Sequence, residues 1–159
     1  MVLVQEIESA EPSILNSNLL LASRTDILLE NYSKVINIEA MTMLDMTKKK
    51  LLPAAMEYGK KICDTAIAKK QLGLDASAET KLAADLDSNT AKMYEAMQAL
   101  ESKVNAAKEI GDVLECAKAY RSQVFSAMSD LRTYADQLEM LVSAEDWPLP
   151  PYSDLLFNV

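Results

Sequence analysis

The chain of 159 residues contains no histidine and only three glycines. Histidine is the side chain that most often serves as a general base near neutral pH and as a ligand of transition metals, so its absence removes the usual basis of both. Gly59, Gly73 and Gly111 lie far apart, and they cannot build a glycine-rich loop that binds phosphate. The composition therefore argues against a glycine-rich nucleotide site and against a histidine-based active site.

Cysteines and long apolar runs are also scarce. Cys63 and Cys116 both fall in helical patterns, and we interpret them as buried, reduced thiols rather than as a disulfide or a redox pair. No basic segment precedes an apolar run at the N-terminus, as a signal peptide would require. The longest apolar runs fall far short of the ~20 residues that span a bilayer. We therefore expect a soluble, cytoplasmic chain with no membrane partner.

Positively charged residues are fewer than negatively charged ones: the chain has 16 Lys and Arg and 24 Asp and Glu, which gives a net charge of −8. A chain of this charge repels phosphate groups, so we expect no nucleic acid partner. The lysine clusters at 48–50, 60–61 and 69–70 are interpreted as solvated side chains rather than as an anion site. No residue is assigned a catalytic, cofactor-binding or metal-binding role.

Helical periodicity is what the sequence has in abundance. Apolar or small residues recur every three or four positions in three stretches, from Leu29 to Ala66, from Leu82 to Ala107 and from Ala117 to Val142. The pattern predicts an all-α protein. In this prediction the second and third helices form a long antiparallel hairpin, and a long first helix completes a three-helix, coiled-coil-like bundle.

Local signals predict where these helices begin, bend and end. Gly73 is expected to end the first helix. Pro53 predicts a kink near Lys49–Leu52 or two abutting helices, because proline removes a backbone hydrogen bond. The residues suited to cap the helix starts are Ser23 or Thr25, then Asp75 or Ser77, and then Asp112. The predicted organisation is a lead-in at 1–23 with a possible short helix, a bundle at 24–146 and an extended C-terminal strap at 147–159.

The strap differs sharply from the helices in composition. It holds the only tryptophan and three of the five prolines, which favour extended backbone. Exposed aromatic side chains gain nothing from water, so we expect the strap to be held on a surface. Two alternatives are open, docking on a partner and closure of the bundle's own core. The candidate interaction residues of the strap are Trp147, Tyr152, Leu155, Leu156 and Phe157.

Between Val35 and Met46 the apolar residues extend beyond a single helix face. A helix that is apolar on nearly all sides needs partners on two sides. The alternatives are burial entirely inside the bundle and contact with something outside it: another region of a longer parent protein, another subunit or the strap. The candidate interaction residues of this segment are Val35, Ile38, Met41 and Met46.

Several of these segments also carry a family resemblance. Residues 29–43 are similar to an E-x-Y-x-K-x-I-x-I-E-A-x-T-M stretch, Leu52–Ala55 to the I-L-P-A that follows it, and residues 68–75 match more loosely. The strap is similar to W-P-x-P-T-Y-x-D-L-L-F, with Pro151 in place of the threonine. Its matching residues are Trp147, Pro148, Pro150, Tyr152, Asp154, Leu155, Leu156 and Phe157. On these blocks the chain resembles the C-terminal region of type III glutamine synthetases.

The resemblance implies a parent enzyme that ligates glutamate and ammonia, using ATP and Mg²⁺ or Mn²⁺, in ring-shaped homo-oligomers. The family's ATP, metal and glutamate sites lie in an upstream catalytic region, and no residue here matches its catalytic motifs. We therefore expect a non-catalytic domain that serves structure, subunit contacts or oligomer assembly, with the catalytic region and other subunits as partners. The alternative is a stand-alone helical adaptor that binds a partner protein through an exposed apolar helix face.

Overall fold

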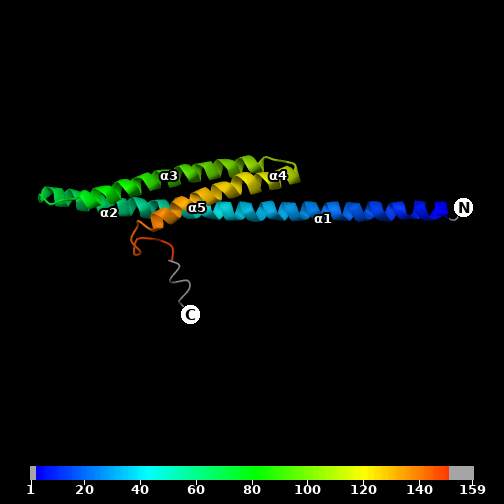
Figure 1. Cartoon of the computed structure of the whole chain (residues 1–159), viewed down its shortest axis with the longest axis horizontal. Helices are drawn as coiled ribbons and strands as arrows, with labels where there is room; N and C mark the ends of the chain where they lie inside the picture. The colour runs from blue at the N-terminus through cyan, green and yellow to red at the C-terminus, as the bar shows by residue number, and fades with distance from the viewer. Residues whose placement is uncertain (1–2, 151–159) are drawn as a thin grey trace, which may run out of the picture.

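The protein is built of three helical rods (Figure 1). The computed structural model describes the backbone of residues 3–150 and the side chains of residues 20–150, and all regular structure in that range is helical. The rods comprise α1 (Leu3–Met46), η1 (Thr47–Leu51) and α2 (Leu52–Gln71), then α3 (Ser77–Lys108), then α4 (Val113–Ala119), η2 (Tyr120–Val124) and α5 (Phe125–Glu139). The predicted all-α bundle is confirmed, because α3 packs on α2 and α5, and α4 packs on α1.

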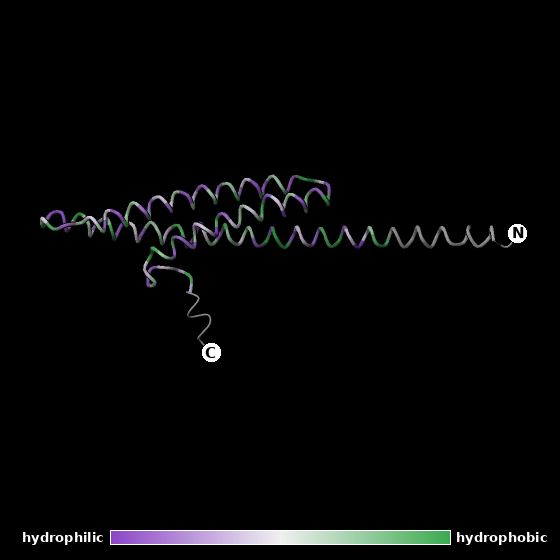
Figure 2. Tube along the Cα trace, viewed as in Figure 1, coloured by the Kyte–Doolittle hydropathy of each residue, from purple (hydrophilic) through white to green (hydrophobic). Residues whose placement is uncertain are grey.

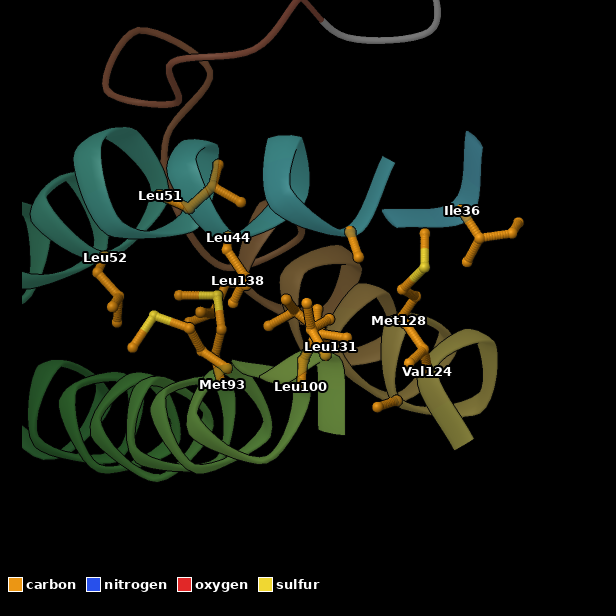
Figure 3. Close-up of a cluster of buried hydrophobic side chains, with 14 of the residues drawn as sticks. Ile36, Leu44, Leu51, Leu52, Met93, Leu100, Val124, Met128, Leu131 and Leu138 are labelled. Carbon is orange, nitrogen blue, oxygen red and sulfur yellow. The ribbon is translucent and has the colours of Figure 1, made fainter. Parts of the chain in front are cut away.

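The core is the seam where the three predicted apolar stripes meet. Side chains from all three rods point toward one another there (Figure 3). Leu44 comes from α1, Met93 and Leu100 from α3, and Leu131 and Leu138 from α5, and all five are buried. Burial of one such side chain contributes roughly 1.5–3 kcal/mol relative to its exposure to water. The seam therefore supplies most of the attraction between the rods.

The first rod contains a π-helical turn, η1, just before Pro53. Proline has no backbone N–H, so the regular ladder of bonds to the fourth preceding residue cannot continue through it. The N–H of Leu52 instead donates to the carbonyl of Thr47, five residues back. Thr47 and Leu51 are both buried in the seam. Where a kink near Lys49–Leu52 or two abutting helices were predicted, the structure has a π turn inside one long rod.

A second π turn, η2, lies in the third rod, and nothing in the sequence predicts it. Phe125 donates its N–H to the carbonyl of Tyr120, although no proline is near. Tyr120 and Val124 are buried, and the Tyr120 hydroxyl donates to Asn37 Oδ1 of α1 at 3.3 Å. Burial raises the pKa of the Tyr120 hydroxyl. The turn therefore places a tyrosine between the third rod and α1.

Gly73 ends the first rod, as predicted. It is the one described residue with a positive φ, 74°. The N–H of Leu74 donates to the carbonyl of Lys69 at 2.9 Å and that of Gly73 to Lys70 at 3.1 Å, the two bonds of a Schellman motif. This left-handed conformation is costly for any residue with a Cβ, so glycine suits the turn between α2 and α3.

Aspartates lie at the starts of the next two rods. The predicted cap at Asp112 is confirmed, whereas the N-cap residue of α3 is Ala76 and not the predicted Asp75 or Ser77. Asp75 accepts hydrogen bonds from the backbone N–H of Ser77 at 3.0 Å and from its hydroxyl at 2.8 Å, and these bonds lower the pKa of Asp75. Asp112 accepts from the N–H of Glu115 at 2.9 Å. Each carboxylate satisfies an N–H that the first helical turn leaves unpaired.

The expected lead-in with a short helix of its own is not a separate element, because α1 runs without a break from Leu3. The expectation that Ser23 or Thr25 caps a helix start is therefore wrong. Thr25 lies inside α1 and donates its hydroxyl to the carbonyl of Leu21 at 2.9 Å. Residues 13–28 contain no glycine or proline, so nothing in them stops the helix. The N-terminal part of α1 projects beyond the α3–α4 turn (Figure 1).

The two cysteines differ in environment. Cys116 is partly buried, and its Sγ lies 3.6 Å from the carbonyl of Ala107. Cys63 is exposed on α2, so the expectation of a buried thiol is wrong there. The helical stripe explains the error, because Ile62 and Ala66 lie on the buried side of α2 and Cys63 falls to one side of them. Neither cysteine is in a disulfide. Among the described residues, no helix is long and apolar enough to cross a membrane.

Replacement of Gly73 with alanine should destabilise the fold by about 1 kcal/mol, because a Cβ disfavours the left-handed conformation. Urea unfolding followed by circular dichroism measures this loss. Gly111→Ala is the matched control, since Gly111 lies in the other inter-rod turn without a positive φ and has open space around its Cα. Equal effects of the two substitutions would contradict the assignment of the Gly73 conformation.

Candidate interaction surface

The helix α1 has two apolar faces, and only one of them meets the bundle. Ile36, Ala40 and Leu44 face the seam and are buried. Val35 and Ile38 lie on the other side of the helix, where their side chains are 52% and 64% exposed. A second apolar face without cover on a folded helix is typical of a contact surface.

Met41 and Met46 lie on the flanks of this outer face. Met41 is 45% exposed, and the Lys108 ammonium approaches its Sδ at 3.8 Å. Met46 is partly buried at the edge of a groove. The four residues predicted on α1 therefore do not form one patch: Val35, Ile38 and Met41 are exposed, whereas Met46 belongs to the groove.

The outer apolar face extends further toward the N-terminus than the sequence analysis predicted. Leu20, Leu21, Ile27 and Leu28 are all more than half exposed. Figure 2 shows apolar positions continuing along α1 where it projects beyond the other rods. The spacing of seven residues from Leu21 to Leu28 and from Leu28 to Val35 is the signal that reveals this extension. We call the face formed by these residues the outer stripe: Leu20, Leu21, Ile27, Leu28, Val35 and Ile38.

A groove of about 590 Å³ separates α1 and η1 from α5 and ends at Leu149 and Pro150. Most of its lining is apolar, and its charged lining residues are Glu39, Arg132, Asp136 and Glu139. Met43, Met46, Leu51, Phe125 and Met128 are among its lining residues. Phe125 also lies under the guanidinium of Arg121, 5.0 Å from the ring centre. None of these α5 residues had been predicted to form a site, because the groove exists only between two rods.

The strap begins with a compact turn. Ser143 accepts at its carbonyl from the N–H groups of Asp146 and Trp147, at 3.1 and 3.0 Å, and its hydroxyl donates to Asp146 Oδ2 at 2.8 Å. These bonds turn the chain back toward the bundle. Trp147 is thereby placed in the core cluster with only 8% of its surface exposed. Its burial matches the alternative in which the strap closes the bundle's own core.

Tyr152, Leu155, Leu156 and Phe157, the other strap candidates, lie outside the described residues. The described part of the strap brings Leu149 against the core cluster. Within the described part of the chain, the buried Trp147 Nε1 has no hydrogen-bond partner, and the indole adds apolar area to the core cluster. The first residues of the strap therefore act as part of the bundle.

An ion pair holds the strap turn against the first rod. The Lys61 ammonium of α2 donates to Asp146 Oδ1, one residue before the buried tryptophan. The hydrogen bonds from Lys61 and then from Ser143 lower the pKa of Asp146, and the bond to Asp146 raises the pKa of Lys61. Both groups are solvent-accessible, so the pair orients the turn more than it stabilises the fold.

The other lysine clusters are also engaged in ion pairs on the surface. Lys48 reaches Glu101 of α3 at 2.7 Å, and Lys69 pairs with Glu79 across the α2–α3 turn. The hydrogen bond from Lys69 lowers the pKa of Glu79. Across the described part of the chain, no group of three or more His, Cys, Asp or Glu side chains is arranged to hold a metal ion.

The contribution of the Asp146–Lys61 pair to stability should depend on pH in a defined direction. The pKa of Asp146 is lowered, so its contribution is present above the unfolded value near 4 and is lost as the pH falls through the folded value. The pKa of Lys61 is raised, so its contribution is present below 10.5 and is lost at higher pH. Asp146→Asn should therefore unfold at a lower urea concentration than the original chain at pH 7, with the gap closing below pH 4.

Emission of Trp147, the only tryptophan, reports on unfolding directly. Asp130→Asn is the control, because Asp130 is an exposed carboxylate of α5 that lies outside the strap turn. A gap between Asp146→Asn and the original chain that stayed constant from pH 7 to pH 3 would contradict the assigned role of the carboxylate.

Comparison with known proteins identifies similarity to glutamine synthetases. Residues 6–70 match the family described as the glutamine synthetase C-terminal domain. The chain is 36% identical over 139 residues to a glutamine synthetase of Butyrivibrio fibrisolvens and 28% identical over 143 residues to a type-3 glutamine synthetase of Dictyostelium discoideum. It is 27% identical over 144 residues to a glutamine synthetase of Bacteroides fragilis (strain YCH46).

These alignments cover 86–87% of this chain but only 20% of each relative. The chain therefore spans about a fifth of the length of the curated relatives that it matches. The matched segment, residues 6–70, contains nearly all of the first rod, and thus the outer stripe and η1. The resemblance predicted from the sequence is confirmed: residues 6–70 match the glutamine synthetase C-terminal domain family, and most of the chain is similar to glutamine synthetases.

Proposed function

We propose that this chain is the non-catalytic C-terminal domain of a type III glutamine synthetase, which contributes to subunit contacts and oligomer assembly in the cytoplasm. The parent reaction is the ATP-dependent ligation of glutamate and ammonia. The match to a type-3 glutamine synthetase over 86% of this chain supports the assignment to type III. The match covers only 20% of that relative, which supports the view that this chain corresponds to one part of a longer enzyme.

The observation that carries the assembly role is the uncovered outer stripe of α1. Val35 and Ile38 are exposed on a helix whose other face is fully used by the seam. Apolar side chains in such a row cost free energy in water and gain it when another protein surface covers them. The stripe therefore supports a contact with the catalytic region or with another subunit.

ATP and Mg²⁺ or Mn²⁺, which the family implies for the parent enzyme, are not placed on this domain. Their binding requires convergent carboxylates or a phosphate-binding loop. The carboxylates of the described residues are spread along rod surfaces, and several pair with lysines: Glu30, Asp45, Glu79, Glu101, Glu115 and Asp146. The described side chains therefore do not fit these groups.

The test uses the enzyme in which this domain is joined to its catalytic region. Ile38→Glu should shift the native assembly toward smaller species, because a carboxylate at a covered apolar position must be desolvated without a partner. Light scattering coupled to size-exclusion chromatography measures the shift. Met56→Glu is the matched control, since Met56 is equally exposed on α2 but lies outside the outer stripe.

Circular dichroism of both variants should show unchanged helicity, since both positions are on the surface. An assembly that is indifferent to Ile38→Glu would remove the assembly role and favour a stand-alone adaptor. Glutamine formation by this purified chain, mixed with ATP, glutamate and ammonia, would overturn its non-catalytic assignment.

A further inference from the structure

The outer stripe runs along two parts of α1, one without buried side chains and one with the bundle on its opposite side. Leu21 and Leu28 are exposed on a part of α1 where no described side chain from Leu20 to Leu28 is buried. The N-terminal part of α1 projects beyond the α3–α4 turn (Figure 1). Val35 and Ile38 lie where the bundle backs the opposite side of the helix. Steps of seven residues link Leu21, Leu28 and Val35. A seven-residue apolar repeat is the pattern by which two helices pack along their length.

We infer that the outer stripe binds the outer stripe of a second copy of this chain, with the two α1 helices antiparallel. This inference rests on the proposed function, because it names the partner of the same surface. The contact extends over residues 20–45, about 39 Å of helix at 1.5 Å per residue.

Self-complementarity of the repeat favours a second copy over an unrelated helix. Two helices pack side by side when each presents the same spacing of apolar residues, and a second α1 supplies that spacing. In the antiparallel arrangement the projecting segment of one copy lies over the bundle-backed part of the other. Leu28 then lies opposite Ile38 of the second copy, and both kinds of uncovered surface are covered in one two-fold contact. Such a contact closes on itself and leaves no free end for further growth.

Charge within the stripe selects the antiparallel orientation. Steps of seven residues also connect Arg24, Asn31, Ile38 and Asp45, so a cation lies toward one end of the stripe and an anion toward the other. Parallel helices would place Arg24 beside Arg24 and Asp45 beside Asp45. Antiparallel helices bring Arg24 near Asp45 of the other copy, although Asp45 also pairs with Lys49 of its own helix. Exposed charges add little to affinity, but like pairs disfavour the wrong orientation.

Sedimentation equilibrium of the full chain, from about 1 to 200 μM, tests the dimer. The original chain should show a reversible monomer–dimer equilibrium. Leu28→Glu should raise the dimer dissociation constant at least about tenfold, because the contact would bury an unpaired carboxylate. Met140→Glu is the control: Met140 is an 85% exposed apolar residue after α5, far from the stripe in the chain, and its replacement should leave the constant unchanged.

Cysteine cross-linking tests the orientation. In a background of Cys63→Ser and Cys116→Ala, a mixture of Leu28→Cys chains with Ile38→Cys chains should form a disulfide-linked heterodimer under mild oxidation. Leu28→Cys chains alone should not cross-link, because antiparallel helices hold the two copies of that position apart. Efficient cross-linking of Leu28→Cys alone would show parallel helices and overturn the inference.

Two further outcomes would also overturn it: a chain that stays monomeric over the whole concentration range, or a dimer indifferent to Leu28→Glu. Failure here is distinguishable from failure of the proposed function. If the chain stays monomeric while Ile38→Glu still disrupts assembly of the intact enzyme, the stripe contacts the catalytic region and only this inference is lost.

Discussion

Burial of one apolar seam among three helical rods is the interaction on which the rest of this structure depends. Isolated helices are only marginally stable in water, and the rods gain their stability from side chains such as Met93, Leu100 and Leu138, which are wholly or almost wholly buried between them. The π turn η1 preserves this arrangement. It accommodates Pro53 while keeping Thr47 and Leu51 on the buried side, so the stripe continues past the proline.

The seam also explains why α1 differs from the other helices. Its length exceeds that of its partners, and no described side chain from Leu20 to Leu28 is buried. The bundle therefore supports the C-terminal part of α1 and leaves the N-terminal part extended. A helix that projects from the bundle and carries exposed apolar side chains can present a contact surface along its length. This geometry connects the fold to the proposed role in assembly.

In the strap, burial of apolar area and hydrogen bonding have different roles. Trp147 contributes a large apolar area to the core, whereas the Lys61–Asp146 pair and the Ser143 hydrogen bonds determine where the turn places it. Hydrophobic contact has no preferred direction, but a hydrogen bond does. The strap turn therefore belongs to the bundle, and the outer stripe is left as the main apolar surface of α1 without cover.

Signals that act over a few residues were predictable from the sequence alone. The three stripes, the turn at Gly73, the cap at Asp112 and the irregularity before Pro53 all follow from helical periodicity or from the backbone chemistry of one residue. The same periodicity indicated that the apolar residues around Val35 and Ile38 extend beyond the one helix face that a bundle buries. The family resemblance depended on sequence blocks of the same local kind.

Only the tertiary structure decided which surfaces are covered. The exposure of Cys63, the π turn η2, the groove between α1 and α5 and the burial of Trp147 each depend on two or three rods at once. A sequence pattern specifies that a residue is apolar and on which side of its helix it lies. Whether that side meets another rod or water is determined by the packing of the whole chain.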